Sequence, residues 1–226
     1  MNDSVDLDRT VAARLAGVRA RIDAVGGRGV TVLPVTKTFT IDRCWAAYRA
    51  GCTAVGENYA QEVVEKFSGL DLPFAVRFIG QLQTNKVRAL APLVAVYESV
   101  DRPSLVDELA KRVPGASILI QVNTAEGADG GKGGCPPGAV EALVERARTA
   151  GLDVRGLMTV GPTVGGPDAA RPGFRVVRSL VDRLGLAECS MGMTDDLEVA
   201  VEEGSTEVRV GSALFGERPR PAEPVR

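Results

Sequence analysis

Short apolar runs alternate along the whole chain with segments of helical periodicity, and this alternation constrains the fold more than any other feature. A first helix is expected over about residues 5–25, where Val11, Leu15, Val18 and Ile22 repeat at spacings of four and three. Eight candidate strands follow, nearly all separated by a helix, at residues 30–35, 53–56, 75–79, 94–99, 116–123, 153–159, 187–191 and 207–210. Strands that alternate with helices indicate parallel βαβ units.

Eight such units in 226 residues predict a single-domain (β/α)8 TIM-type barrel over residues 1–226, at the small end of that fold's size range. The segment after Phe215 is too short and proline-rich for another full helix. We therefore expect the N-terminal helix to close the barrel exterior there, with residues 217–226 as a loose tail. An open doubly wound sheet would need a glycine-rich turn after the first strand. That turn reads Thr36-Lys37-Thr38-Phe39-Thr40, so the barrel is favoured.

Charge and composition exclude several classes of protein. The 27 basic and 29 acidic residues give a net charge of −2 without a block of like charges, which argues against a nucleic-acid partner. No apolar run approaches the roughly 20 residues of a membrane span, and the polar N-terminus is unlike a signal peptide, so a cytoplasmic protein is expected. The chain has no histidine and its four cysteines form no Cys-x-x-Cys pair, which excludes the usual zinc sites and His-dependent catalysis.

The residues that could carry chemistry follow the carboxyl ends of the predicted strands, where barrel active sites lie. Lys37 follows the first strand, and a lysine whose pKa is lowered by burial or a nearby cation can attack an aldehyde. Ser190 and Gly192 follow the seventh strand, and Gly211 and Ser212 follow the eighth. Glycines let backbone N–H groups approach an anion, and these two loops are a frequent phosphate site. Each feature alone fits a solvated lysine or an ordinary turn, but together they indicate a phosphorylated aldehyde.

Other polar residues near the strand ends have simpler explanations. Asn58 is expected to N-cap a helix with Gln61 as its capping-box partner, although an N-cap at a barrel mouth can also face a ligand. Asp195 is expected to cap a later helix together with Glu198. Lys132 lies between two glycine pairs in a long loop that lacks the Lys-Ser/Thr sequence of a Walker motif, so a nucleotide site of that type is rejected.

Several longer segments match one known family in the expected order. They are Leu33–Lys37, Val55–Glu62, Phe78–Lys86, Val122–Asn123, Lys132–Gly134, Gly156–Thr159, Ser190–Asp196 and Val208–Gly216. On these motifs the chain resembles the pyridoxal phosphate homeostasis proteins (the YggS/PROSC family), whose fold is similar to the N-terminal barrel of alanine racemase.

The resemblance implies pyridoxal 5′-phosphate (PLP) as the cofactor and Lys37 as its Schiff-base lysine. It implies that Arg209 faces the pyridine nitrogen, and that the remaining cofactor contacts are Asn58, Met158, Ser190, Gly192, Gly211 and Ser212. The family usually has an aromatic residue and then His before Phe-Ile-Gly, where this chain has Val76 and Arg77. If that His contacts the cofactor, Arg77 must replace it or the pocket differs.

The predicted function is that of a monomeric PLP carrier that maintains vitamin B6 homeostasis without strong turnover and can supply apo-PLP enzymes, with Lys132 as a secondary acceptor. The alternative is a racemase-like PLP enzyme, which needs a base on each face of the ring. In alanine racemase the base opposite the lysine is a tyrosine from a second domain, which this sequence lacks; the tyrosines here are Tyr48, Tyr59 and Tyr97. A more remote alternative is a Schiff-base aldolase without a cofactor.

Overall fold

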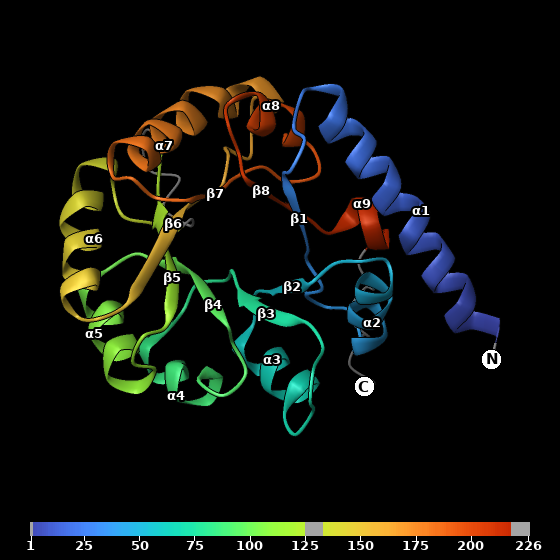
Figure 1. The fold of residues 1–226 in the computed structure, drawn as a ribbon, viewed down its shortest axis with the longest axis horizontal. Coiled ribbons are helices and arrows are strands. Elements are labelled where there is room, and N and C mark those ends of the chain that lie inside the picture. The colour runs from blue at the N-terminus through green and yellow to red at the C-terminus, as the bar shows by residue number, and fades with distance from the viewer. Residues whose placement is uncertain (1, 125–132, 218–226) are drawn as a thin grey trace, which may run out of the picture.

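The eight strands form one parallel sheet that curls into a barrel, with helices around its outside (Figure 1). The computed structural model describes residues 2–124 and 133–217. The order of the strands in the sheet is β1-β8-β7-β6-β5-β4-β3-β2. The strands are β1 Thr31–Pro34, β2 Ala54–Glu57, β3 Ala75–Phe78, β4 Val96–Val100, β5 Ser117–Val122, β6 Asp153–Thr159, β7 Glu188–Ser190 and β8 Glu207–Val210. The predicted (β/α)8 architecture is confirmed.

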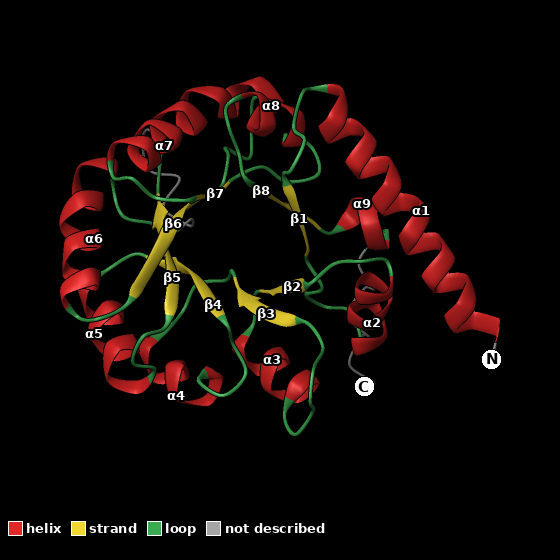
Figure 2. Ribbon diagram, in the orientation of Figure 1, coloured by secondary structure: helices red, strands yellow, loops and turns green. Residues whose placement is uncertain are grey.

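Helices fill the connections between the strands, as Figure 2 shows. The α-helices are α1 Asn2–Ala24, α2 Ile41–Arg49, α3 Ala60–Phe67, α4 Val87–Leu90, α5 Pro103–Arg112, α6 Val140–Thr149, α7 Arg171–Arg183, α8 Leu197–Glu202 and α9 Ser212–Phe215. Short 3-10 turns precede three of them, η1 at Thr84–Lys86, η2 at Pro137–Ala139 and η3 at Pro167–Ala170. Within the described ranges, none of these helices has the length and apolar character needed to cross a membrane.

The N-terminal helix α1 covers the outside of β1 and β8, as predicted (Figure 1). Its stripe of Val11, Leu15, Val18 and Ile22 is buried in one cluster with side chains of α2, α8 and α9. The helix α9 after β8 has only four residues and cannot cover the barrel alone. Within the described residues, the apolar stripe of α1 therefore takes the place of a full-length helix after β8.

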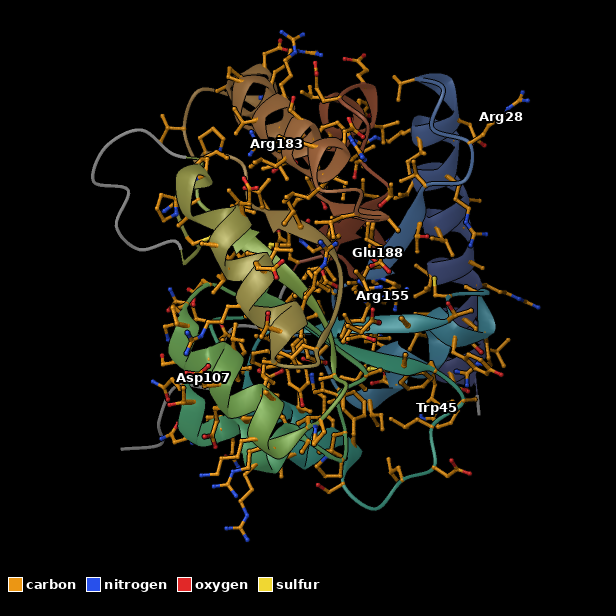
Figure 3. All side chains as sticks on the ribbon, turned by 60° about the vertical axis from the view of Figure 1, so that its left-hand side comes forward. Arg28, Trp45, Asp107, Arg155, Arg183 and Glu188 are labelled. Atoms are coloured by element: carbon orange, nitrogen blue, oxygen red, sulfur yellow. The ribbon has the colours of Figure 1, made fainter. Side chains whose placement is uncertain are left out.

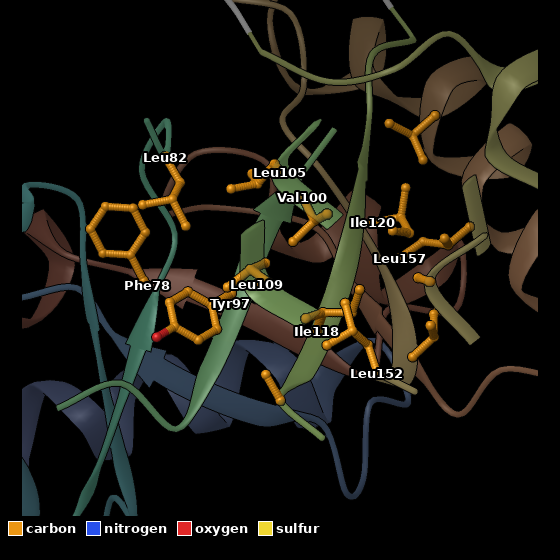
Figure 4. Close-up of a cluster of buried hydrophobic side chains, with 14 of the residues drawn as sticks. Phe78, Leu82, Tyr97, Val100, Leu105, Leu109, Ile118, Ile120, Leu152 and Leu157 are labelled. Carbon is orange, nitrogen blue, oxygen red and sulfur yellow. The ribbon is translucent and has the colours of Figure 1, made fainter. Parts of the chain in front are cut away.

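Most of the core lies between the strands and the outer helices. Figure 4 shows part of this layer, in which Phe78 and Tyr97 from neighbouring strands pack near Leu105 and Leu109 of α5. These side chains are at most 1% exposed. Burying a leucine or phenylalanine of this kind stabilises the fold by about 1.5–3 kcal/mol. The inside of the barrel, by contrast, combines a small apolar cluster with charged side chains.

Two predicted helix caps are wrong. The N-cap of α3 is Tyr59 and not Asn58, and the Gln61 side chain donates to Glu65 at 2.9 Å instead of returning to the cap. The N-cap of α8 is Asp196 and not Asp195. Its expected partner, Glu198, instead accepts two hydrogen bonds from the Arg21 guanidinium of α1, at 2.6 and 2.8 Å. In both cases a charged side chain, Glu65 or Arg21, is the partner of the side chain that the capping box would use.

Candidate functional site

A pocket of about 380 Å³ opens at the carboxyl ends of the strands, the mouth of the barrel. A volume of this size is within the range of small-molecule sites. Five predicted site residues line it together: Lys37, Asn58, Arg209, Gly211 and Ser212. The other lining residues are Val35, Phe39, Ile79, Val160, Met193, Thr194 and Asp195.

A larger hollow of about 540 Å³ lies on the outside of the barrel, between η2 and α7. Its lining includes Arg175, Ser179 and Arg183 but no lysine and no residue that follows a strand end. The mouth pocket is therefore the better candidate for the predicted chemistry.

Lys37 lies in a tight turn between β1 and α2. The turn spans Thr36 to Phe39 and is closed by the Phe39 N–H, which donates to the Thr36 carbonyl at 3.1 Å. Thr38 has a φ of 67°, and it is the one non-glycine residue with a positive φ in the described parts of the chain. A β-branched residue in this conformation costs about 1–3 kcal/mol, and such strain tends to be stored at functional sites. The strained turn carries the half-buried Lys37 to the pocket.

Asn58 contributes an unsatisfied acceptor. Its Oδ1 atom is buried and has no hydrogen-bond partner in the protein. Leaving a buried polar atom unpaired costs about 1–3 kcal/mol. Because Asn58 also lines the pocket, a ligand that donates a hydrogen bond there would recover that cost.

Arg209 supplies a fixed cation at the inner side of the pocket. The residue is 4% exposed, and its guanidinium donates to the Ser190 hydroxyl at 2.8 Å and to the Thr159 carbonyl at 2.6 Å. Burial lowers the pKa of Arg209, while the nearby Glu98 and Glu207 oppose that shift. A guanidinium keeps its proton even when buried, so Arg209 stays charged.

Arg77 does not line the pocket but belongs to an ionic network inside the barrel. Its guanidinium lies 2.5 Å from Glu98, 2.7 Å from Glu188 and 3.2 Å from Glu207. Burial works against this cation, but the attraction of Glu98 and Glu207 outweighs it and raises the pKa of Arg77. Glu188 also pairs with Arg155 of β6 (Figure 3). The guanidinium of Arg77 is thus paired with three carboxylates and does not face the pocket.

Ser190 connects this network to Arg209, and its hydrogen bonds indicate which carboxyl group is protonated. Its Oγ atom lies 2.9 Å from both Glu98 Oε2 and Glu207 Oε1, and it accepts a hydrogen bond from Arg209. A hydroxyl has one proton and can donate to only one carboxylate. The other contact is a hydrogen bond only if the second carboxyl group is protonated. Burial and the charge of Glu98 raise the pKa of Glu207 to about 8, which makes Glu207 the protonated partner near neutral pH.

The remaining predicted residues lie behind the pocket or outside the described residues. The Ser190 side chain is fully buried in the network, and Met158 packs with Val96 and Leu119 inside the barrel. Gly192 has a φ of 94°, and a Cβ there would lie 2.4 Å from the Cβ of Ala200. The contacts predicted for these residues with a cofactor stay predictions. Lys132 lies outside the described residues.

The sequence analysis missed several residues of the site. Thr194 lines the pocket and accepts a hydrogen bond from the Ser212 hydroxyl at 3.2 Å. Its place after Met191 and Gly192 in the loop of the seventh strand could have indicated this role. Glu98 and Glu207 could have been noticed as charged residues within mainly apolar strands, since such residues need a partner when buried.

Comparison with known proteins identifies the family. The model of the alanine racemase N-terminal domain matches residues 8–219. A pyridoxal phosphate homeostasis protein of Aquifex aeolicus is 40% identical over an alignment that covers 91% of this chain and 97% of the relative. This chain belongs to the pyridoxal phosphate homeostasis family. A second family relative, from Pseudomonas aeruginosa, is 38% identical over 92% of this chain and 96% of its own length.

Solved structures of similar fold include one with bound PLP. PipY of Synechococcus elongatus, solved with PLP bound, superposes with a TM-score of 0.80 at 28% identity and covers 91% of this chain and 100% of its own. The same protein without PLP gives a TM-score of 0.81 at 29% identity. The fold of PipY is thus shared along nearly the whole of this chain.

Proposed function

We propose that this chain binds PLP as a Schiff base on Lys37 and holds it for vitamin B6 homeostasis, as a monomer in the cytoplasm. The observation that carries the proposal is the composition of the mouth pocket. It unites an amine on a strained turn, a buried cation and an unsatisfied acceptor, namely Lys37, Arg209 and Asn58. These groups fit the aldehyde, the ring nitrogen and the ring substituents of PLP. The names of the family relatives and the PLP bound to PipY support the same cofactor.

Each end of the cofactor has candidate partners. The hydroxyls of Ser212 and Thr194, beside Gly211, line the pocket where a phosphate would be held. Ser190 and Gly192, which lie just behind, are retained in the proposal as contacts implied by the family. PLP supplies a reactive aldehyde and an electron-accepting ring. Because Arg209 cannot give up its proton, it leaves the ring nitrogen unprotonated and weakens that ring as an electron sink.

The proposal is for a carrier without strong turnover and not for a racemase. Racemisation at two faces of the ring needs an acid or base on each. None of the three tyrosines lines the pocket. Tyr48 and Tyr59 are 38% and 51% exposed, and Tyr97 is buried in the layer outside the strands. The carboxylate that lines the pocket, Asp195, is exposed.

The proposal is tested by trapping the bound cofactor. The purified protein with PLP is reduced with borohydride and digested, and the pyridoxyl mass is expected on the peptide that contains Lys37. A Lys37→Ala variant, folded as judged by circular dichroism, is expected to lose the visible absorbance and the label. A label on another lysine in place of Lys37 would refute the site, and racemisation of an added amino acid would refute the absence of turnover.

A further inference from the structure

The backbone on both sides of Lys37 is fixed by side chains that do not line the pocket. The carbonyl of Thr36 accepts a hydrogen bond from the Lys66 ammonium of α3 at 2.9 Å. The Thr36 hydroxyl donates to Glu57 at 2.7 Å, and the residue is fully buried. On the other side, the Thr38 N–H donates to Glu62 of α3 at 2.8 Å. Hydrogen bonds therefore fix both neighbours of Lys37 in the chain, Thr36 and Thr38.

The Lys66 ammonium is the centre of this arrangement. It donates to the Thr36 carbonyl, to Glu57 Oε1 and to Glu62 Oε2, each at 2.9 Å. An ammonium has three N–H donors, and here each has a partner. The Lys66 side chain is only 11% exposed, and burial favours its neutral form. The two carboxylates outweigh that effect and raise the pKa of Lys66, so it stays charged at neutral pH.

The conformation of Thr38 needs such support. A turn with a positive φ at its third residue normally has glycine or asparagine there. This chain has a β-branched threonine at that position, with a φ of 67°. The hydrogen bond from its N–H to Glu62 stabilises a backbone conformation that threonine alone disfavours. Without that bond, the turn would be free to relax and to redirect Lys37.

We infer that Lys66, together with Glu57 and Glu62, is a positioning residue that holds Lys37 in the orientation in which its amine reacts with the cofactor aldehyde. The inference rests on the proposed function, because it assigns a role in forming the Schiff base. None of the three residues lines the pocket, so they act through the turn and not by contact with a ligand. Their loss should therefore affect the covalent bond more than the fit of the ring and phosphate.

The test compares two ligands in Lys66→Met and in a matched control, Lys111→Met, which changes an exposed lysine of α5. Pyridoxamine 5′-phosphate carries the ring and phosphate but no aldehyde, so it reports on the pocket alone. PLP, followed by absorbance and by borohydride trapping, reports on the bond to Lys37. For Lys66→Met we expect affinity for pyridoxamine 5′-phosphate within about threefold of the wild type. The equilibrium constant for Schiff-base formation should fall at least about tenfold, as for loss of a hydrogen bond to a charged group.

The outcomes separate the two proposals. If the wild-type protein is not trapped on Lys37, the proposed function fails. If it is trapped and Lys66→Met is trapped equally well, or if both ligands weaken together, the positioning role is overturned. Should Lys66→Met not fold, Glu62→Ala decides, because it removes the acceptor of the Thr38 N–H and leaves the Lys66–Glu57 pair in place. Selective loss of the Schiff base in Glu62→Ala supports the role, and wild-type behaviour overturns it.

Discussion

Glu207 is a buried carboxyl group inside the barrel, and its protonation state determines the charge of the surrounding network. Its carboxyl group faces Arg77 from β3, Glu98 from β4, Ser190 from β7 and Arg209 from its own strand. Glu98 and Glu207 both lie 2.9 Å from the one Ser190 hydroxyl, so two ionised carboxylates would repel each other there. A protonated Glu207 removes this repulsion and satisfies the hydrogen bonds of Ser190. In a chain without histidine, this carboxyl group is the expected source of titration near neutral pH.

The first prediction concerns the pH dependence of stability. The pKa of Glu207 is raised from 4.5 to about 8 in the folded protein, so the folded state holds this proton more tightly than the unfolded chain. The stability that this group contributes is therefore present at low pH and is lost as the pH rises to about 8, by at most about 1.4 kcal/mol per pH unit. The free energy of unfolding in urea should be measured for the wild type and for Glu207→Gln between pH 4.5 and about 8. As the pH rises, the wild type should lose stability relative to Glu207→Gln, which has no carboxyl group to ionise.

The matched control for this prediction is Glu145→Gln, on the exposed surface of α6. Its stability should run parallel to that of the wild type at every pH. Parallel profiles for Glu207→Gln as well would mean that Glu207 is already ionised in the folded protein.

The second prediction contrasts the two predicted phosphate-site glycines. Gly192→Ala places a Cβ 2.4 Å from Ala200 at a φ of 94°, so strain and overlap should cost about 2–4 kcal/mol. At Gly211 the nearest atom to a new Cβ is 3.4 Å away and φ is −111°, so Gly211→Ala should change stability by less than about 0.5 kcal/mol. Denaturant midpoints measure both. Equal costs would mean that the backbone around Gly192 can rearrange.

Sequence reasoning found the site residues that are placed by topology and missed those placed by side-chain packing. Lys37 and Asn58 follow strand ends, and the barrel brings all strand ends to one mouth. The pairing of Arg77 with Glu98 and Glu207 depends on which strands adjoin and which side chains point inward. Those facts follow from the sheet order and register, which a pattern of charges along the chain does not contain.

At the scale of elements, α1 shows how far one apolar stripe can compensate for a missing helix. Strand positions followed from apolar runs, and the existence of each main helix followed from its periodicity. Helix starts were less predictable, since Glu198 prefers the guanidinium of Arg21 to its own backbone. A pattern within one element cannot show that a neighbouring element offers a stronger partner.

The third prediction compares two sites on α1. Leu15 is 2% exposed in the cluster with α2, α8 and α9, so Leu15→Ala should lower the free energy of unfolding by about 2–4 kcal/mol. Gly17 is exposed, and a Cβ there meets no atom within 4 Å. Gly17→Ala should therefore raise stability by about 0.5–1 kcal/mol, because alanine favours a helix interior. Thermal unfolding tests both signs, and a neutral Leu15→Ala would show that α1 does not close the barrel in solution.

For the molecule as a whole, the candidate site coincides with the place where the barrel closes. The first and last strands of the sheet order, β1 and β2, meet through one bridge between Val35 and Gly56 and through the Thr36 N–H, which donates to the Gly56 carbonyl at 3.0 Å. Lys37 comes directly after these residues. A ligand in the pocket therefore bridges residues at the carboxyl ends of β1, β2 and β8 and is expected to bind only the closed barrel.

The fourth prediction follows from this linkage. PLP at about 100 times its dissociation constant should raise the free energy of unfolding by about 2.7 kcal/mol. The same PLP concentration should stabilise Lys37→Ala less, because only the contacts to the ring and phosphate remain. Differential scanning calorimetry with and without PLP measures the shift. An equal shift in both proteins would show that the bond to Lys37 adds nothing to binding.

The fifth prediction concerns release of the cofactor to other proteins. We expect Lys132, which lies between β5 and η2 in the sequence, to accept PLP from Lys37 by exchange of one amine for another. Lys132→Ala should then slow transfer to an apo-PLP enzyme while leaving the amount trapped on Lys37 unchanged. Lys111→Met serves as the control for removal of a lysine. Equal transfer rates at equal PLP loading would exclude this role for Lys132.

The partners of α1 have a consequence for how the protein is made. Part of the apolar stripe of α1 packs against Leu197, Val201 and Leu214, which a ribosome synthesises near the end of the chain. At the usual rates of synthesis, those partners emerge roughly 10–40 s after the helix itself. During that interval the nascent chain exposes an apolar helix that α2 alone covers incompletely. We expect this segment to be bound by chaperones on the ribosome until the last strand has been released.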